Sequence, residues 1–383
     1  MKKAISITIK ILVIIPLSIL LIAGIFYART KIYRFPVEIP FSGSEYYNPY
    51  RKITDHKLKG NLHAHGYSWG GLTNGHDEPE KIYEFYENNG YEVVGISNYH
   101  RVDKTSCAST SLKMPVYEHG YNLLKSHNLA INPTKTSFFD YPLWQMTSHK
   151  QHVIDKMKDN DAKVVIAHPK LFNSKTSYDL SKLCNYDFIE VFNHYYDSEE
   201  PWDRALSAGR VVWGLSSDDI HALSDEPVCK RWNVIYAGEK SIEGVMDAMD
   251  SGTFYMVKSQ DGEFDNDLKS CRVVDDVLTV AFKRKLDHIR LKGKQGVLLK
   301  EVRDTNAVSY NITPCDTYVR TVASTGSDQL LLNPVIKSFS SDIKPEFSLT
   351  PEVNQTATWL FRIGTIIFMV AQAFLIRLVI KRL

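Results

Sequence analysis

The sequence predicts an α/β barrel followed by a smaller β-rich domain, with an apolar helix near each end of the chain. Three observations support this fold class. Helical and strand patterns alternate over residues 56–258, short strands alone follow over residues 259–345, and long apolar runs lie near both termini. A chain of 383 residues can hold two domains, and a hydrophobic content of 44% is ordinary for a protein with a complete core.

The first element is an apolar run at residues 8–29, where no charge falls between Lys10 and Arg29. Its uncharged stretch of 18 residues approaches the roughly 20 that a helix needs to cross a bilayer. The basic start, with Lys2 and Lys3, is also typical of a signal peptide, but no small-x-small cleavage site precedes an obvious mature start. We therefore expect an uncleaved transmembrane anchor.

Residues 30–55 contain several prolines and are expected to form a linker that lies against the body. Residues 56–258 then alternate between helical and strand patterns. The expected helices are 79–89, 149–160, 201–208 and 241–251, and each precedes an expected strand, at 91–97, 162–167, 211–215 and 253–257. Pro79 starts the first of these helices and Gly90 follows its end. Repeated alternation with functional groups at strand ends is typical of an α/β barrel.

Residues 259–345 lack the helical pattern. Short strands are expected at 271–274, 277–282, 288–291, 317–322 and 330–332, with turns between them. This spacing predicts a small β-sandwich-like domain. We expect the domain to pack on the barrel or to form a lid.

The last element is an apolar run at residues 357–380, expected to be a second transmembrane helix. Arg362 and Arg377 lie near its ends, where long cationic side chains reach the membrane interface. The basic C-terminal tail and the basic N-terminus both favour the cytoplasm, so the body would face outward from a membrane, expected to be a bacterial plasma membrane. The cations that closely follow residue 28 argue against this orientation.

The composition excludes several classes of protein. The net charge is +2 and no basic run is longer than a few residues, so nothing indicates a nucleic-acid partner. The five cysteines show no CxxC spacing, which argues against a zinc ribbon and a thioredoxin-like site. Cys271 and Cys315 would pair only outside the cytosol, and free buried thiols are the favoured state.

Side chains that bind transition metals follow many of the expected strands. His63 and His65 lie at i and i+2 on an extended backbone, so both imidazoles point to the same face. A chance pair of this kind is unremarkable among 13 histidines, but further candidates recur at the ends of apolar runs. The full set is His63, His65, Glu118, His127, His168, Asp219 and His221. Imidazole and carboxylate ligands together suit zinc, manganese or iron.

Taken in chain order, these motifs resemble the polymerase and histidinol phosphatase (PHP) family. The motifs are Asn-Leu-His-Ala-His, Glu-His-Gly, His-Asn-Leu-Ala-Ile, Ala-His-Pro and Ser-Asp-Asp-Ile-His. The resemblance covers about residues 56–260. It implies a distorted seven-stranded (β/α) barrel of PHP type, with two or three metal ions at the C-terminal ends of the strands.

The resemblance also implies a role for each ligand. One metal ion would be held by His63, His65, Glu118 and Asp219. Glu118 would bridge it to a second ion, which His127 and His168 would also hold. The catalytic group would be a metal-bound water held by Glu118 and Asp219, ionised near neutral pH. The expected cofactors are therefore two divalent ions, zinc, manganese or iron.

A third metal site is where this chain departs from the family pattern. His221 and His76 are available for it, but Ser97-Asn98-Tyr99-His100 stands where the family has Thr-Asp-His. Tyr99 takes the slot of the histidine, and a shift of one residue on a strand turns His100 to the other face. Two metal ions are therefore expected, with His76 and His100 as the alternative ligands of a third.

Three further charged residues have two interpretations each. Lys170 follows the Ala-His-Pro motif and Arg101 follows His100, and each either binds an anionic part of the substrate or is a solvated surface cation. Glu190 lies inside an apolar strand, where an unpaired charge costs several kcal/mol. It either accepts a hydrogen bond from a ligand histidine or pairs with a buried Lys or Arg.

The leading functional hypothesis is a membrane-tethered, metal-dependent phosphoesterase that acts on a small-molecule or lipid-associated ester. One alternative is a hydrolase of a carboxyl ester, an amide or a carbamate, since the same hydroxide attacks those carbonyl groups. Another is a non-catalytic metal-binding module. Measured metal content and a panel of model esters separate the three.

Overall fold

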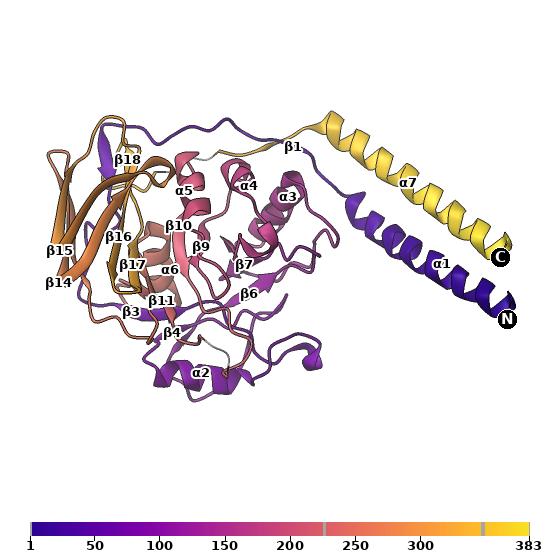
Figure 1. Cartoon of the computed structure of the whole chain (residues 1–383), viewed down its shortest axis with the longest axis horizontal. Coiled ribbons are helices and arrows are strands. Elements are labelled where there is room, and N and C mark those ends of the chain that lie inside the picture. The colour runs from indigo at the N-terminus through magenta and orange to yellow at the C-terminus, as the bar shows by residue number, and fades with distance from the viewer. Residues whose placement is uncertain (1, 225–226, 346–348, 383) are drawn as a thin grey trace.

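The computed structural model describes residues 2–224, 227–345 and 349–382. Figure 1 shows a body of mixed helices and strands, from which two long terminal helices project on one side. The strands of the C-terminal part lie on the opposite side of the body. The chain is thus a mixed α/β protein with a two-domain architecture.

Eight short strands line the middle of the body. They are β3 (Leu58–Asn61), β4 (Val93–Val94), β5 (Leu112–Lys113), β6 (Val116–His119), β7 (Asn128–Ile131), β8 (Lys163–Ile166), β9 (Phe188–Phe192) and β10 (Trp213–Ser216). All residues of β9 and the last three of β8 are buried. Such strands are apolar without alternation because both of their faces are covered.

The hydrogen-bonded neighbours among these strands close into a ring. One sheet runs in the order β10-β9-β8-β7-β6. An isolated parallel bridge between Tyr99 and Glu118 joins β6 to the chain after β4, and β4 pairs with β3. A second bridge, between Ala64 and Ile220, joins the chain after β3 to the chain after β10. Strand β7 is antiparallel to both β6 and β8, so the ring departs from a simple parallel barrel.

Helices cover the outside of the ring, and local sequence explains where they begin and end. They are α2 (Pro79–Asn88), α3 (Thr147–Lys158), α4 (Ser177–Lys182), α5 (Glu199–Ser207) and α6 (Ile242–Ser251). Pro79 occupies the first turn of α2, where its missing N–H costs nothing. Thr176 and Asp179 form a capping box at α4. Gly252 ends α6 in the left-handed region at φ 76°, a conformation that favours glycine.

The C-terminal strands continue the barrel sheet instead of only packing against it. The strands of residues 259–345 are β13 (Leu268–Val274), β14 (Val277–Lys292), β15 (Leu298–Asn311), β16 (Tyr318–Thr325), β17 (Asp328–Leu332) and β18 (Val335–Ser338). They follow β11 (Arg231–Ile235) and β12 (Phe254–Lys258), which lie within residues 56–258. Strand β11 pairs with β3 and β12, and β12 pairs with β17. The predicted β-sandwich-like domain is therefore joined edge to edge to the barrel, a connection that the sequence analysis did not predict.

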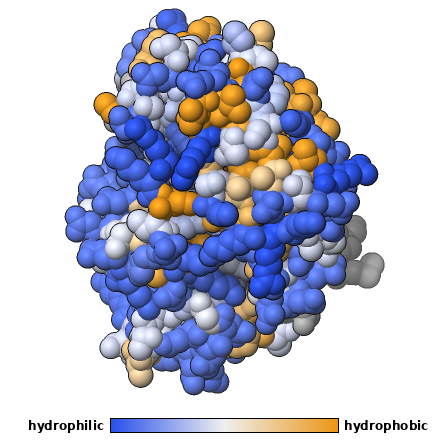
Figure 2. All heavy atoms as spheres, turned by 90° about the vertical axis from the view of Figure 1, so that its left-hand side faces the viewer, coloured by the Kyte–Doolittle hydropathy of each residue, from blue (hydrophilic) through white to orange (hydrophobic). Residues whose placement is uncertain are grey.

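The segment expected to be a linker also takes part in the fold. It contributes β1 (Tyr33–Arg34), which pairs with β19 (Glu352–Val353), and β2 (Glu45–Tyr47), which pairs with β18. Figure 2 shows the face on the side of the β14–β15 hairpin, where hydrophilic residues predominate and hydrophobic residues gather mainly in the upper half. Charged residues along β15, including Lys300 and Arg303, protect an exposed strand edge from pairing with other chains.

A buried ion pair fastens the C-terminal strands to the barrel. Arg320 of β16 is fully buried and donates from Nε and Nη2 to the two oxygens of Asp203 on α5, at 2.7 and 2.6 Å. Its Nη2 also lies 2.9 Å from Glu199. The guanidinium rests over the ring of Trp202 at 5.3 Å. Two parallel hydrogen bonds of this kind fix geometry as well as charge.

The two terminal helices are α1 (Lys2–Tyr27) and α7 (Gln355–Arg382). They pack side by side in opposite directions, with both termini at the far end (Figure 1). Gly24 allows the close approach, since an added Cβ would lie 2.6 Å from the side chain of Met369. In the described part of the chain, Gln355–Lys381 is long and apolar enough to cross a membrane, whereas Ile11–Tyr27 is a shorter apolar helix.

Candidate metal centre

The candidate ligands come from five places in the ring, and the fold brings most of them together. His63 and His65 follow β3, Glu118 lies in β6, His127 precedes β7, His168 follows β8, and Asp219 and His221 follow β10. Three groups of side chains have ligand atoms within 4.8 Å of one another. They are His63, His65 and Glu118; His65, Asp219 and His221; and Glu118, His127 and His168.

Glu118 is the residue that joins two of these groups. Its Oε2 lies 3.1 Å from Nε2 of His65. Its Oε1 lies 2.7 Å from Nδ1 of His127 and 3.1 Å from Nε2 of His168. Its Oε1 also lies 3.6 Å from Nε2 of His63, so the carboxylate faces one histidine at Oε2 and three at Oε1.

His63, His65 and Asp219 complete the first side of the cluster. Nε2 of His63 lies 3.1 Å from Oδ1 of Asp219, and Nε2 of His65 lies 3.5 Å from the same oxygen. The two Nε2 atoms are 3.2 Å apart. All three side chains are buried, so water does not screen these contacts.

Charge in the cluster is concentrated and unbalanced without a cation. Burial acts to raise the pKa of Glu118, but His127 and His63 outweigh it and hold that pKa well below its ordinary value. Burial acts to lower the pKa of His63, but Asp219 and Glu190 outweigh it and raise that pKa well above its ordinary value. The pKa of Asp219 is lowered, against the effect of burial, chiefly by His63. The carboxylates are therefore ionised and attract positive charge, which protons or metal ions can supply.

Polar atoms without hydrogen bonds show that the donor set fits metal ions. Among the described residues, Glu118 Oε2 and His127 Nδ1 have no partner with hydrogen-bond geometry, although both are buried at close contacts. Nδ1 of His63 donates to the Glu190 carboxylate, so a metal ion that displaced the proton from Nε2 would meet a lone pair directed into the cluster. Lone pairs of several ligands then converge on shared space, an arrangement that a cation stabilises.

Glu190 accepts hydrogen bonds from two of the candidate ligands. Its Oε1 accepts from His63 Nδ1 at 2.7 Å, and its Oε2 accepts from the backbone N–H of His168 at 2.9 Å. Asn193 donates both to Glu190 Oε2, at 2.9 Å, and to Asp219 Oδ2, at 3.2 Å. Of the two interpretations offered for Glu190, the structure gives it the contacts of an acceptor for a ligand histidine.

His221, His76 and His100 do not form one site. His221 stacks on His65, with ring centroids 4.5 Å apart, and burial lowers its pKa to about 4. His76 is exposed, and its backbone N–H donates to the carbonyl of His221. His100 donates from Nδ1 to Ser137 O at 2.8 Å and accepts at Nε2 from the N–H of Gly120 at 3.2 Å. Neither His76 nor His100 belongs to a ligand group among the described residues.

Tyr99, and not His100, lies beside the candidate ligands. Its ring stacks on His65 with centroids 4.7 Å apart and meets the edge of His127 at 5.5 Å. Burial raises the pKa of the Tyr99 phenol, and the charges of Glu118 and Asp219 raise it further. The phenol therefore lies beside both carboxylates as a neutral hydrogen-bond donor.

The two candidate substrate-binding cations lie on the surface. Lys170 is exposed and lies two residues after His168. Arg101 is exposed, and its guanidinium lies 5.8 Å from the centre of the Trp69 ring. Neither interpretation of these two residues is decided by these positions alone.

Sequence reasoning missed Asn193 and Lys175, and it placed Tyr99 at the site only as the residue in the slot of a histidine. Lys175 is buried and donates from Nζ to the carbonyl of His127 at 2.6 Å, and burial lowers its pKa to about 7. Asn193 follows β9, three residues after Glu190. This spacing indicates a hydrogen bond between the two side chains only once Glu190 is known to lie at the centre. Lys175 sits in a loop without a pattern, and no sequence signal identifies it.

The fold and the cluster together define a mixed α/β protein with a candidate site for divalent metal ions. No protein-family model matches the chain, and no curated protein matches it. One similar solved structure is a two-domain protein from Bacteroides vulgatus ATCC 8482 that contains a predicted PHP-like metal-dependent phosphoesterase. It is 14% identical, with 81% of this chain and 99% of that chain covered and a TM-score of 0.42.

A second similar solved structure is endonuclease Q in complex with a 27-mer duplex substrate that has an abasic lesion at the active site. It is 13% identical, with 51% of this chain and 56% of that chain covered and a TM-score of 0.33. Neither similarity is high enough to assign the family, the activity or the substrate of this chain.

Proposed function

We propose that this protein is a membrane-tethered, metal-dependent phosphoesterase of PHP type. The observation that carries the proposal is the position of Glu118. Its Oε2 faces His65 and its Oε1 faces His127 and His168, with His63 farther from Oε1 at 3.6 Å, as a carboxylate between two cations would. The order of the metal-binding motifs along the chain, which resembles the PHP family, supports the same conclusion.

The residues divide into two overlapping ligand sets. The first ion would be held by His63, His65, Glu118 and Asp219, and the second by Glu118, His127 and His168. His221 lies close to His65 and Asp219 of the first set and would be a further ligand there. Bound divalent ions supply Lewis-acid polarisation of a phosphoryl oxygen and a lowered pKa of water. Imidazole and carboxylate donors suit zinc, manganese and iron alike.

The protein's own side chains would then orient and stabilise. Glu190 fixes the tautomer of His63, so that Nε2 faces the centre as a lone pair. Asn193 ties the same carboxylate to Asp219. The neutral phenol of Tyr99 is placed to donate to an oxygen of the reacting group. Lys170 is an exposed cation two residues after His168 and would bind an anionic part of the substrate.

The tether rests on the exposed apolar surface of the two terminal helices. Leu12 and Ile22 of α1 and Ile367 of α7 are each 59–68% exposed. Exposed side chains of this size cost about 1.5–3 kcal/mol each relative to burial, and so many in one projecting pair need an apolar surrounding. The full chain should remain with membranes after a wash in high salt or alkaline carbonate and should dissolve in detergent. Release by either wash would refute the tether.

The proposed activity is tested on the detergent-solubilised full chain. Metal content would be measured by mass spectrometry, and turnover would be measured with p-nitrophenyl phosphate, bis-p-nitrophenyl phosphate and p-nitrophenyl acetate. We expect about two metal ions per chain and hydrolysis of a phosphoester that chelation abolishes. Turnover of the acetate alone would favour the carboxyl-ester alternative. Bound metal without any turnover would favour the non-catalytic module.

A matched pair of variants shows whether the histidine cluster is responsible. His63→Ala removes a ligand that contacts a carboxylate at 2.7 Å. His288→Ala removes a histidine at the same 2.7 Å distance from Glu301 on the outer hairpin, far along the chain from every ligand. The first variant should lose metal and turnover, and the second should keep both.

A further inference from the structure

A pocket of about 600 Å³ lies beside the candidate metal centre. It is lined by residues of the loops that follow β4 and β7 and by Trp69. The lining includes Trp69, His100, Arg101, Lys104, Lys135 and Phe138. None of these residues is a member of the ligand groups described above.

A short chain of contacts links this pocket to the centre. Trp69, in the pocket wall, donates from Nε1 to the carbonyl of Tyr99 at 2.8 Å. The ring of Tyr99 stacks on His65, with centroids 4.7 Å apart. One residue, Tyr99, therefore separates the wall of the pocket from a candidate ligand.

The pocket carries positive charge that the protein does not neutralise. Arg101, Lys104 and Lys135 line it, and its lining contains no carboxylate. Across the described ranges, none of the three cations forms an ion pair with an acidic side chain. Three like charges around one hollow focus a potential that attracts an anion.

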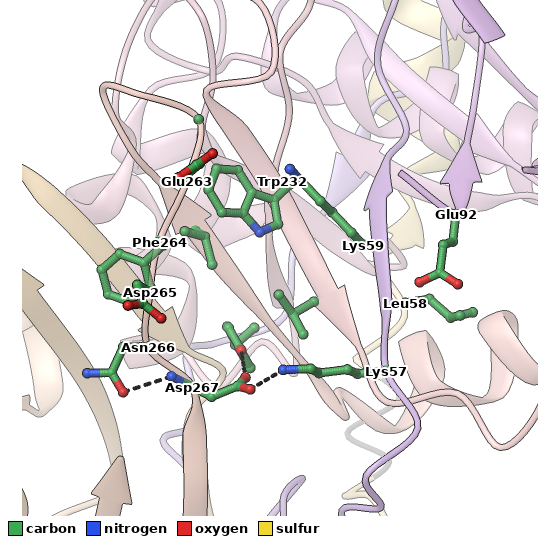
Figure 3. Close-up of a pocket in the computed structure, with 14 residues that line it drawn as sticks. Lys57, Leu58, Lys59, Glu92, Trp232, Glu263, Phe264, Asp265, Asn266 and Asp267 are labelled. Carbon is green, nitrogen blue, oxygen red and sulfur yellow. Dashed lines mark hydrogen bonds and ion pairs between the residues drawn. The ribbon is translucent and has the colours of Figure 1, made fainter. Parts of the chain in front are cut away.

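A second pocket of the molecule shows the contrast. It measures about 480 Å³, and its cations are compensated (Figure 3). Lys57 pairs with Asp267, and Lys59 lies over the ring of Trp232 at 4.4 Å. Glu263 also lines it. The pocket beside the candidate metal centre thus differs from this second pocket, because no acidic side chain is among its described lining residues.

Aromatic side chains give the basic pocket an apolar wall. Trp69 is 44% and Phe138 is 56% exposed, and their rings meet edge to face at 6.4 Å. Phe138 also stacks on His100 at 5.3 Å, and His100 is held by its bond to Ser137. Exposed aromatic rings next to cations suit a ligand that joins an anionic group to a ring or a short carbon frame.

We propose that this pocket binds a second anionic group of the substrate, joined by a ring or short carbon frame to the phosphoester that reacts at the metal centre. The inference rests on the proposed function and names its substrate class: compact phosphoesters with two anionic ends, in preference to simple monoesters. Arg101 is then a specificity residue that acts together with Lys104 and Lys135.

The test compares two esters that differ only in the second anion. Phenyl phosphate carries one phosphate, and benzene-1,4-diyl bisphosphate carries two on the same ring. Release of inorganic phosphate by the metal-loaded full chain in detergent gives kcat/KM for each. We expect kcat/KM for the bisphosphate to exceed that for phenyl phosphate at least about tenfold. The two equivalent ends of the bisphosphate account for a statistical factor of about two, and the three exposed cations, each adding a few-fold, would supply the rest.

Two triple variants with the same change in net charge locate the effect. Arg101→Gln/Lys104→Gln/Lys135→Gln should reduce the preference to about the statistical factor of two. Lys285→Gln/Lys294→Gln/Lys300→Gln removes three exposed lysines of the β14–β15 hairpin and should keep it. Equal preference in the pocket variant and the wild type would overturn the proposal.

A binding measurement separates this inference from the proposed function. If the wild type hydrolyses neither ester, the phosphoesterase proposal fails, and calorimetry with the bisphosphate on the chelator-treated full chain decides the pocket. Binding to the wild type and the hairpin variant, with loss in the pocket variant, supports an anion subsite. Equal binding to the wild type and the pocket variant, or no binding to either, refutes it.

Discussion

The substitution Glu190→Gln tests the metal centre without touching a ligand. Glu190 accepts three hydrogen bonds, one at Oε1 from His63 Nδ1 and two at Oε2 from His168 N and Asn193 Nδ2. Glutamine has nearly the same shape but only one acceptor oxygen. It cannot satisfy both sides of this network.

Each orientation of the new amide has a definable cost. With its oxygen toward His63, its NH₂ group meets the donors of His168 and Asn193. With its oxygen toward those donors, its NH₂ group meets Nδ1 of His63 and forces the ring into the tautomer that points a proton at the centre. An unsatisfied buried donor costs about 1–3 kcal/mol. Loss of a partner that orients a metal ligand weakens metal affinity about 10- to 100-fold, which equals about 1.4–2.8 kcal/mol.

Metal affinity is the readout, measured by competition with a chromophoric chelator on the full chain in detergent. Asp316→Asn is the control, because Asp316 is a carboxylate of the C-terminal strands that accepts from Tyr310 Oη and from the N–H and hydroxyl of Thr313, away from the ligand groups. It should lower the melting temperature and leave metal affinity within about twofold. If Glu190→Gln binds metal as tightly as the wild type, then Glu190 does not orient a ligand and the assignment of His63 is wrong.

Three further outcomes follow from the structure. His100→Ala should leave metal content unchanged by mass spectrometry, because both ring nitrogens already bond to backbone groups; loss of one ion per chain would restore a third metal site. Arg320→Met should lower the free energy of unfolding by about 3–5 kcal/mol by denaturant titration, because Asp203 is left buried and unpaired, and Asp203→Leu added to it should recover part of the loss. Burial lowers the pKa of His149 and His152 from 6.5 to about 3. The unfolded chain therefore takes up protons first as the pH falls, and the free energy of unfolding decreases between pH 7 and pH 5 by at most about 2 kcal/mol per histidine. The apparent melting temperature should drop over the same range, and the double variant His149→Gln/His152→Gln should show a smaller drop.

Local patterns predicted the helices and strands of the barrel well where burial and caps act within a few residues. The helix expected at 149–160 occurs at Thr147–Lys158, and the one expected at 241–251 occurs at Ile242–Ser251. The strand expected at 162–167 occurs at Lys163–Ile166. The periodicity of a helix and the apolar run of a buried strand are properties of the segment itself, so the sequence carries them directly.

Pairing over long distances could not be predicted in the same way. The antiparallel course of β7 depends on which strands become its neighbours. The contact of β12 with β17 depends equally on tertiary packing. The convergence of Glu118 with His65 and His168 was expected only because the motif order resembles a known family, since no spacing within one segment encodes a distance across the ring.

The short segment after β4 connects the two parts of the site. His100 has a positive φ of 51°, a conformation that is costly for a residue with a Cβ and that a neighbouring network must hold in place. His100 lines the pocket and bonds to Ser137 and Gly120, while Tyr99 remains over His65. The phenol of Tyr99 thus lies at the centre and the imidazole of His100 lies in the neighbouring pocket. If the pocket binds the second anion of the substrate, this segment, where the sequence differs from the PHP pattern that it resembles elsewhere, would favour substrate selectivity over a third metal ion. A variant with a histidine at position 99, Tyr99→His, should then gain metal content and lose preference for the bisphosphate, and a gain in metal with unchanged preference would separate the two effects.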